Sequence, residues 1–152
     1  MRKPFYIVVL SVLAILGCGS ENKIPDEILN TEVDVRVSRF DNEFAKATAE
    51  DIPKLRKVYP YLFPAPDSVW VAKLHDSLQI ELREEVKTEF VDFDEEVADL
   101  EILFKHIMYY FPKYEVPRII TVTNDVDYNN RIILADSLLL IGLDNYLGPD
   151  HR

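Results

Sequence analysis

The feature that most restricts the fold of this chain is one long stretch with apolar side chains at helical spacing. Intervals of three and four residues place these side chains on one face of a helix. The members of the stripe are Val97, Leu100, Phe104, Ile107 and Phe111, with Leu103 and Tyr110 widening it. Asp92 and Glu95 have the spacing of a capping pair at its start, and Pro112 cannot continue it. A stripe this wide predicts a long helix that is buried at the centre of the domain.

Strand patterns lie on both sides of this stretch. Residues 31–40 alternate, with Val33, Val35 and Val37 on one face, which predicts a half-buried strand. Downstream, short apolar runs separated by turn residues predict a small, mostly antiparallel sheet. These runs cover residues 118–123, 132–134 and 138–141. The order of one strand, several helices and then strands is typical of an α+β fold, with the other helices gathered around the long one.

Between the first strand and the long helix, the sequence predicts shorter helices and one ordered loop. Apolar spacing and capping pairs such as Asp76 and Gln79 predict helical turns around residues 52–58, 67–74 and 76–86. Residues 59–66 are rich in prolines and aromatic side chains, so they cannot form a helix and are too apolar to lie free in water. We expect Tyr61 and Phe63 of this loop to point into the core.

The first residues have the pattern of a bacterial lipoprotein signal. A basic start, Arg2-Lys3, precedes an apolar run that is too short to span a bilayer core of about 30 Å. The run ends in Ile15-Leu16-Gly17-Cys18, which resembles the lipobox, where the cysteine sulfur receives a diacylglycerol and the chain is cut before it. We predict a signal peptide at 1–17, a lipidated Cys18 carrying palmitate-type chains, and a polar tether at 18–30. A non-cleaved membrane helix, or an ordinary secretory signal with an incidental cysteine, is the alternative.

The residue after the cysteine indicates which membrane holds the anchor. Position 19 is Gly, whereas an Asp there is the usual signal for retention in the inner membrane. The sequence therefore favours the outer membrane, with the protein facing the periplasm.

Composition and charge exclude several classes of function. The formal charge of −10 repels nucleic-acid phosphates and anionic lipid headgroups, so no nucleic-acid partner is expected. The chain has four glycines and no G-x-G-x-x-G or G-K-[ST], which argues against a phosphate-binding loop. A single cysteine excludes a framework of disulfides.

Acidic and amide residues cluster near the C-terminal strands. Asp125, Asp127, Asn129 and Asp136 fall at positions one, three, five and twelve of a calcium loop. This segment lacks the Gly at position six and ends in Asp rather than Glu, so we favour simple turns, which Asn and Asp also form. Asp144 follows a buried apolar run and is either a cap or a site residue. We predict no cofactor, metal or catalytic residue, because the three histidines are scattered and neither H-E-x-x-H nor G-x-S-x-G occurs.

Several distinctive blocks follow one another along the chain. They are YPYLFP at 59–64, DSVW at 67–70, YYFP at 109–112, NDVDY at 124–128 and ADSLLLIGLDNYLG at 135–148. In this order they resemble the gliding-motility-associated lipoprotein GldB family, from about residue 31 to the last residue. The resemblance implies a cell-envelope lipoprotein of gliding bacteria, needed by the machinery that moves adhesins over the cell surface. Family members continue beyond the last block, so residues 31–152 are expected to be the N-terminal part of a longer α+β domain.

These observations lead to one main functional hypothesis and two alternatives. The main hypothesis is a non-enzymatic lipoprotein that contacts other proteins of a motility or secretion apparatus, with Asp127, Asp136 and Asp144 as a candidate contact surface. The first alternative is a zinc-metallopeptidase-like envelope protein, active or degenerate, whose metal-binding helix is missing from this chain. Its basis is that the block around Asp144 is similar to regions of such proteins. A solute-binding lipoprotein is the second alternative and rests only on the polar loop.

Overall fold

The computed structural model describes residues 23–149, and the chain divides into two compact units, 1–31 and 32–152. The described part of the first unit contains a short helix, α2 (Asp26–Leu29), within the segment predicted as a tether. The predicted signal peptide and Cys18 lie outside the described residues, as does His151. Across residues 23–149, no helix combines the length and the apolar character that crossing a membrane requires.

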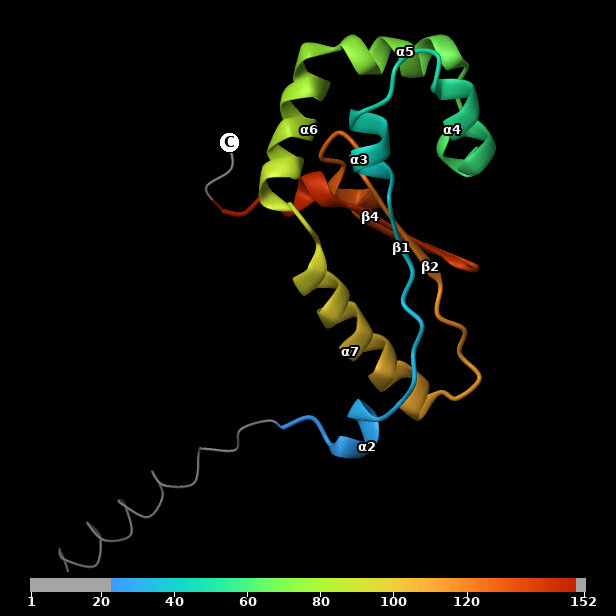
Figure 1. Ribbon diagram of the computed structural model, residues 1–152, viewed down its shortest axis with the longest axis vertical. Coiled ribbons are helices and arrows are strands. Elements are labelled where there is room, and N and C mark those ends of the chain that lie inside the picture. The colour runs from blue at the N-terminus through green and yellow to red at the C-terminus, as the bar shows by residue number, and fades with distance from the viewer. Residues whose placement is uncertain (1–22, 150–152) are drawn as a thin grey trace, which may run out of the picture. The chain divides into compact units, whose positions relative to one another are not determined.

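The second unit has the predicted α+β fold (Figure 1). In chain order its elements are β1 (Val37–Arg39), α3 (Phe40–Ala45), α4 (Ile52–Val58), η1 (Pro60–Leu62), α5 (Asp67–His75), α6 (Ser77–Glu89), α7 (Asp94–Tyr110), β2 (Arg118–Val122), η2 (Tyr128–Asn130), β3 (Ile132–Ala135), β4 (Leu138–Gly142) and η3 (Leu143–Asn145). One strand therefore comes before the helices, and the other strands of the described chain come after them.

The sheet is mixed, and its strand order is β1-β2-β4-β3. β1 pairs with β2 and β2 pairs with β4 in parallel, whereas β3 and β4 form an antiparallel hairpin. The prediction of a mostly antiparallel sheet is therefore wrong. Parallel neighbours need a long crossover connection rather than a turn. Helices α3 to α7 provide the connection from β1 to β2, and the segment containing η2 and β3 connects β2 to β4.

The N-terminal strand is shorter than predicted. Only Val37–Arg39 pair with β2, and the chain turns into α3 at Phe40. Val37 lies opposite Ile119 in the ladder, so an extension of β1 toward the N-terminus would bring residue 35 opposite Pro117. Proline has no N–H to donate to a neighbouring strand. The alternating pattern that suggested a longer strand therefore continues past the point where pairing is available.

The two faces of the sheet pack against different cores. Ile119 and Ile120 are neighbours in β2, are both fully buried, and point to opposite faces. Ile120 belongs to a core built from α3, α4, α5 and the loop after α4. Its other buried members are Phe40, Phe44, Ile52, Leu55, Tyr59, Phe63 and Leu74. A second core contains Val86, Phe93 and Leu143, with Val37 and Ile141 packed against it.

The long helix is confirmed as α7, but its central burial is not. Val97 and Leu100 pack against the second core, and Phe104 is buried with its ring stacked on Tyr114 at 6.3 Å between centroids. The exposed members of the predicted stripe are Leu103, Tyr110 and Phe111. Periodicity defines which face of a helix is apolar, and the described residues cover only part of that face.

In the proline-rich loop, Tyr59 occupies the buried position that we expected for Tyr61. Phe63 is buried as predicted, but Tyr61 is exposed. The Tyr59 hydroxyl donates a hydrogen bond to Glu43 Oε1 at 2.7 Å, and the Arg118 guanidinium lies 5.3 Å from the ring centroid. Burial, together with the bond to the Glu43 carboxylate, raises the pKa of Tyr59 to about 12.

This pKa predicts a loss of stability at alkaline pH that a Tyr59→Phe chain should lack. In the unfolded chain a tyrosine loses its proton near pH 10, while folded Tyr59 keeps its proton until about pH 12. The contribution of Tyr59 to the free energy of unfolding is therefore complete below about pH 10 and is lost as pH rises toward about 12. Urea unfolding of both chains at about pH 9 and about pH 11 measures this. Equal decreases in the two chains would show that Tyr59 is not the titrating group.

Candidate functional site

Three parallel strands end side by side, and a polar residue follows each of them. Asp41 lies in the first turn of α3, directly after β1. Asn124 follows β2, and Asp144 follows β4 within η3. The carboxyl ends of parallel strands meet at one edge of a sheet, which is where ligands bind in open α/β sheets. This edge, which we call the strand-end edge, is therefore the candidate site.

Asp144 is buried at the strand-end edge, with 2% of its surface exposed, and it binds backbone rather than solvent. Its two carboxylate oxygens each accept a hydrogen bond from the N–H of Asn124 at 3.1 Å, and Oδ2 also accepts one from the N–H of Val126 at 2.7 Å. In the turn that these groups form, Asp125 and Val126 have φ angles of 63° and 55°. Residues with a side chain rarely adopt this left-handed region, and β-branched residues do so least. The Asp144 carboxylate therefore holds an unfavourable turn in place.

Asn124 fixes the same loop through its side chain. Its Oδ1 accepts a hydrogen bond from Nδ2 of Asn145 at 2.8 Å. Its Nδ2 donates to the carbonyl oxygens of Asp127 and Asn130 at 3.3 and 3.0 Å. The side chain lies directly against Gly142, where an added Cβ would come within 2.8 to 2.9 Å of it. Position 142 must therefore be glycine for Asn124 to make these bonds.

Asp125 points outward from the turn and connects it to two helices. Its Oδ2 accepts a hydrogen bond from Lys73 Nζ of α5 at 2.9 Å, and its Oδ1 accepts one from Gln79 Nε2 of α6 at 2.7 Å. Desolvation raises the pKa of this carboxyl, but the bonds from Lys73 and Gln79 outweigh it, so the pKa of Asp125 lies below its ordinary value. The loop after β2 is thus joined to the helices through an ionised carboxylate.

A second buried carboxylate, which no local sequence pattern marks, follows β1. Asp41 is 4% exposed, and it accepts hydrogen bonds from the Thr121 hydroxyl and from Nε and Nη2 of Arg39 at 3.0 and 2.7 Å. Arg39 Nη2 also donates to the carbonyl oxygen of Phe90 at 3.0 Å, and its guanidinium lies 4.8 Å from the Phe93 ring centroid. This network joins β1, β2 and the link between α6 and α7.

The structure separates Asp127 from Asp136, two aspartates of the predicted contact surface. Asp127 precedes η2, where its carboxylate accepts hydrogen bonds from the N–H of Asn129 at 3.1 Å and from Asn130 Nδ2 at 2.6 Å. Asp136 is exposed in the turn between β3 and β4, with a φ of 48°. β3 therefore lies between Asp127 and Asp136. Asp136, the twelfth residue of the calcium pattern, does not join the other acidic and amide residues of that pattern. These Asn and Asp residues have the turn geometry that the sequence favoured.

Metal-ligating side chains do not converge in the part of the chain that the structure describes. Over residues 23–149, no three His, Cys, Asp or Glu side chains are placed to hold a metal ion together. His106 is partly buried on α7, and its Nδ1 forms a hydrogen bond with the carbonyl oxygen of Ile102 at 2.8 Å. This histidine therefore has a local backbone partner one helical turn away.

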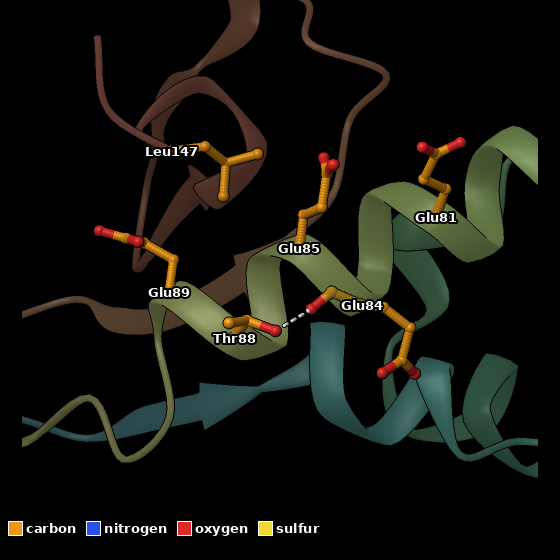
Figure 2. Close-up of a pocket in the computed structure, with 6 residues that line it drawn as sticks. All are labelled: Glu81, Glu84, Glu85, Thr88, Glu89 and Leu147. Carbon is orange, nitrogen blue, oxygen red and sulfur yellow. Dashed lines mark hydrogen bonds between the residues drawn. The ribbon is translucent and has the colours of Figure 1, made fainter. Parts of the chain in front are cut away.

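Glutamates of α6 line a depression of about 370 Å³ (Figure 2). The residues around it are Glu81, Glu84, Glu85, Thr88, Glu89 and Leu147. Figure 2 shows their carboxylates pointing in different directions. The Thr88 hydroxyl donates a hydrogen bond to the Glu84 carbonyl oxygen at 2.8 Å. Diverging charges on the outer face of an amphipathic helix are what solvent exposure alone produces.

Comparison with known proteins gives a match to a protein family. Residues 21–152 match the protein family described as gliding motility protein GldB. No curated protein matches the chain, and no solved structure does. The matched range includes the whole of the second unit and therefore the strand-end edge with both of its buried carboxylates.

Proposed function

Because the chain belongs to the gliding motility protein GldB family, we propose that it is a cell-envelope lipoprotein and a non-enzymatic component of the gliding machinery. The family match carries this proposal, since it extends over residues 21–152 and not over a single short motif. Involvement in gliding motility follows from the family. The non-enzymatic role and the location are the parts that we propose.

The strand-end edge supports a structural role for its polar groups. Asp144 is held by two backbone N–H groups, Asn124 by a neighbouring amide and two carbonyl oxygens, and Asp41 by Arg39 and Thr121. A catalytic acid or base has to reach a proton on the substrate. The polar groups at this edge hydrogen-bond to the protein itself and thereby fix the shape of the loop. A loop of defined shape is suited to binding a partner.

We propose that this loop contacts other proteins of the apparatus. Tyr128 of this loop is exposed, and the Arg131 guanidinium lies 3.8 Å from the Tyr128 ring centroid. Tyrosine and arginine are enriched at protein interfaces. Asp127 belongs to the same loop and Asp136 to the hairpin turn, so the two form separate parts of the proposed contact surface. Asp144 contributes from the interior, by holding the loop in shape.

The sequence supports an anchor in the outer membrane, on the side that faces the periplasm. Ile15-Leu16-Gly17-Cys18 has the lipobox pattern, and Gly19 stands where an Asp would direct retention in the inner membrane. In this proposal, acyl chains on Cys18 hold the protein at the membrane.

Deletion of the gene should abolish colony spreading and the movement of single cells on a surface, with growth nearly normal. A component of the gliding machinery is needed for movement and not for metabolism, so the two readouts should separate. Time-lapse microscopy of the deletion strain, and of the same strain carrying the gene on a plasmid, measures the effect. A deletion strain that glides at the normal speed would overturn the functional assignment.

Two tyrosine variants in the complemented strain test the proposed contact surface. Tyr128→Ala should reduce gliding while the amount of protein stays unchanged. Tyr110→Ala is the matched control, because Tyr110 on α7 has a similar exposed fraction, 63% compared with 67% for Tyr128. Equal gliding of the two variants would place the contact surface elsewhere.

A further inference from the structure

We propose that the aromatic residues at the end of α7 lie in the interface of the membrane that holds the lipid anchor, and that they orient the domain on it. These residues are Tyr109, Tyr110 and Phe111, which are 41%, 63% and 65% exposed. The rings of Tyr109 and Tyr110 pack edge to face, at 5.0 Å between centroids. We call these three residues the aromatic corner. The inference rests on the proposed lipidation of Cys18.

The chain enters the second unit beside the aromatic corner. Glu32, the first residue of the unit, lines a depression of about 590 Å³ together with Met108 of α7 and Tyr114. The N–H of Ile119 donates to the carbonyl oxygen of Arg36 at 2.9 Å, which continues this contact into the sheet. The predicted tether therefore joins the domain at the C-terminal end of α7 (Figure 1).

The length of the tether decides which end of the domain lies near the membrane. Residues 18–32 span at most about 50 Å when fully extended, and about 20 Å on average as a flexible coil. The helix α2 within this segment shortens it further. The 17 residues of α7 span about 25 Å. The average tether is thus shorter than α7, so the end of α7 next to Glu32 is held closest to the lipid.

The aromatic corner has the chemistry of a membrane interface. A tyrosine ring is apolar and its hydroxyl is polar, so tyrosines are enriched where hydrocarbon meets headgroups, and phenylalanine adds apolar area. Residues 108–114 contain one Lys and no Asp or Glu, in a chain whose formal charge is −10. The stem of Lys113 can stay with the rings while its ammonium reaches the headgroups. Glu32 and Glu115 line the neighbouring depression, so we expect a neutral lipid surface and not an anionic one.

Contact at the aromatic corner directs the strand-end edge away from the membrane. β1 begins at Val37 and β2 at Arg118, both at the end where the tether enters. The two strands are parallel, so they run away from this end together, toward Asp41 and Asn124. The proposed contact surface on the loop after β2 then faces the periplasm, where other proteins of the apparatus can reach it.

Fluorescent labelling of the full-length lipidated chain in phosphatidylcholine vesicles tests this contact. Acylation consumes the Cys18 thiol, so an introduced cysteine is the one free thiol for an NBD label. A label at Lys113→Cys leaves all three rings in place, and a label at Val91→Cys is the matched control. Val91 is 75% exposed and lies just before α7, at the opposite end of that helix. Nitroxide-labelled phosphatidylcholine should quench the label at residue 113 several-fold more strongly than the label at residue 91.

Serine variants show whether the rings cause the quenching. In the Lys113→Cys chain, Tyr110→Ser together with Phe111→Ser should lower the quenching to the level of residue 91. Leu78→Ser is the matched control and should leave it unchanged, because Leu78 is 72% exposed but lies on α6. All three side chains are exposed, so these changes should affect stability little. The acyl chains hold the protein without the corner, and Tyr110→Ala leaves two rings, so that variant remains a suitable control for gliding.

The outcomes separate this inference from the lipid anchor. A chain that does not float with the vesicles would disprove the anchor and the membrane contact together. A chain that floats but shows equal quenching at residues 113 and 91 would overturn the membrane contact alone. A protein partner at the aromatic corner would give this second result. Quenching that persists in the double serine variant would overturn the role of the rings.

Discussion

A Cys18→Ser chain should incorporate no fatty acid and should accumulate as the uncleaved precursor. The diacylglycerol is attached to sulfur, and Cys18 is the only cysteine in the sequence, so no other residue can take its place. A serine hydroxyl has nearly the same size but does not supply the thiolate nucleophile. Growth with labelled palmitate, followed by immunoprecipitation and electrophoresis, gives both the label and the size of the product.

A Gly19→Asp chain is the matched control for this result. It keeps the cysteine, so it should be labelled and cleaved as the natural chain is. Its Asp supplies the retention signal that position 19 lacks, so it should move from the outer-membrane fraction to the inner-membrane fraction. Equal labelling of the Cys18→Ser chain and the natural chain would disprove lipidation at this residue. Unchanged fractionation of Gly19→Asp would disprove the proposed sorting.

Local sequence signals predicted the helices well because their causes lie within a few residues. Asp76 and Gln79 have the spacing of a capping pair, and the Asp76 side chain accepts a hydrogen bond from the Gln79 N–H at 3.0 Å. The stripe of α7 likewise defines a helix that the structure contains. Whether its apolar face is covered depends on segments far away in the chain, and periodicity carries no information about them.

The direction of the strands could not be predicted for the same reason. Each apolar run shows that a strand exists, but pairing is decided by which strand lies beside it. β2 lies between β1, which precedes all the long helices, and β4, which follows the hairpin turn. Turn residues between apolar runs predict antiparallel pairing. That prediction is correct for β3 and β4, which are joined by two residues, and wrong for the parallel pairs β1–β2 and β2–β4.

The candidate site was predicted in part. Asp144 stands out in the sequence because a carboxylate directly after a buried run is either a cap or a site residue. The Asp41 network was missed because Thr121 is 80 residues away from Asp41 in the sequence and no motif connects them. Gly142 is a local signal of a close approach that could have pointed to this site, since it interrupts an apolar run just where the Asn124 side chain lies against the backbone.

Replacing Asp144 with alanine should lower the free energy of unfolding by about 3 kcal/mol or more. The substitution removes the acceptors of two backbone N–H groups, and bonds to a charged group contribute about 1.5–3 kcal/mol each. It also releases the left-handed turn at Asp125 and Val126 and leaves a small cavity at a site that is 2% exposed. A domain of this size has a total stability of about 5–15 kcal/mol, so the loss is a large fraction of it.

Urea unfolding of the Asp144→Ala, Asp144→Asn and Asp127→Ala chains measures this effect and separates its causes. Asp127 also accepts a backbone N–H bond, but it does so from a partly exposed position at the start of η2, so Asp127→Ala should cost only about 1 kcal/mol. Asp144→Asn keeps one acceptor oxygen, but its amide N–H groups face the donors of the turn, so its cost should lie between the other two. If Asp144→Ala and Asp127→Ala cost the same, the buried carboxylate does not hold the turn. The shape of the loop after β2 would then have to depend on Asn124, which contacts Gly142 and Asn145 independently of Asp144.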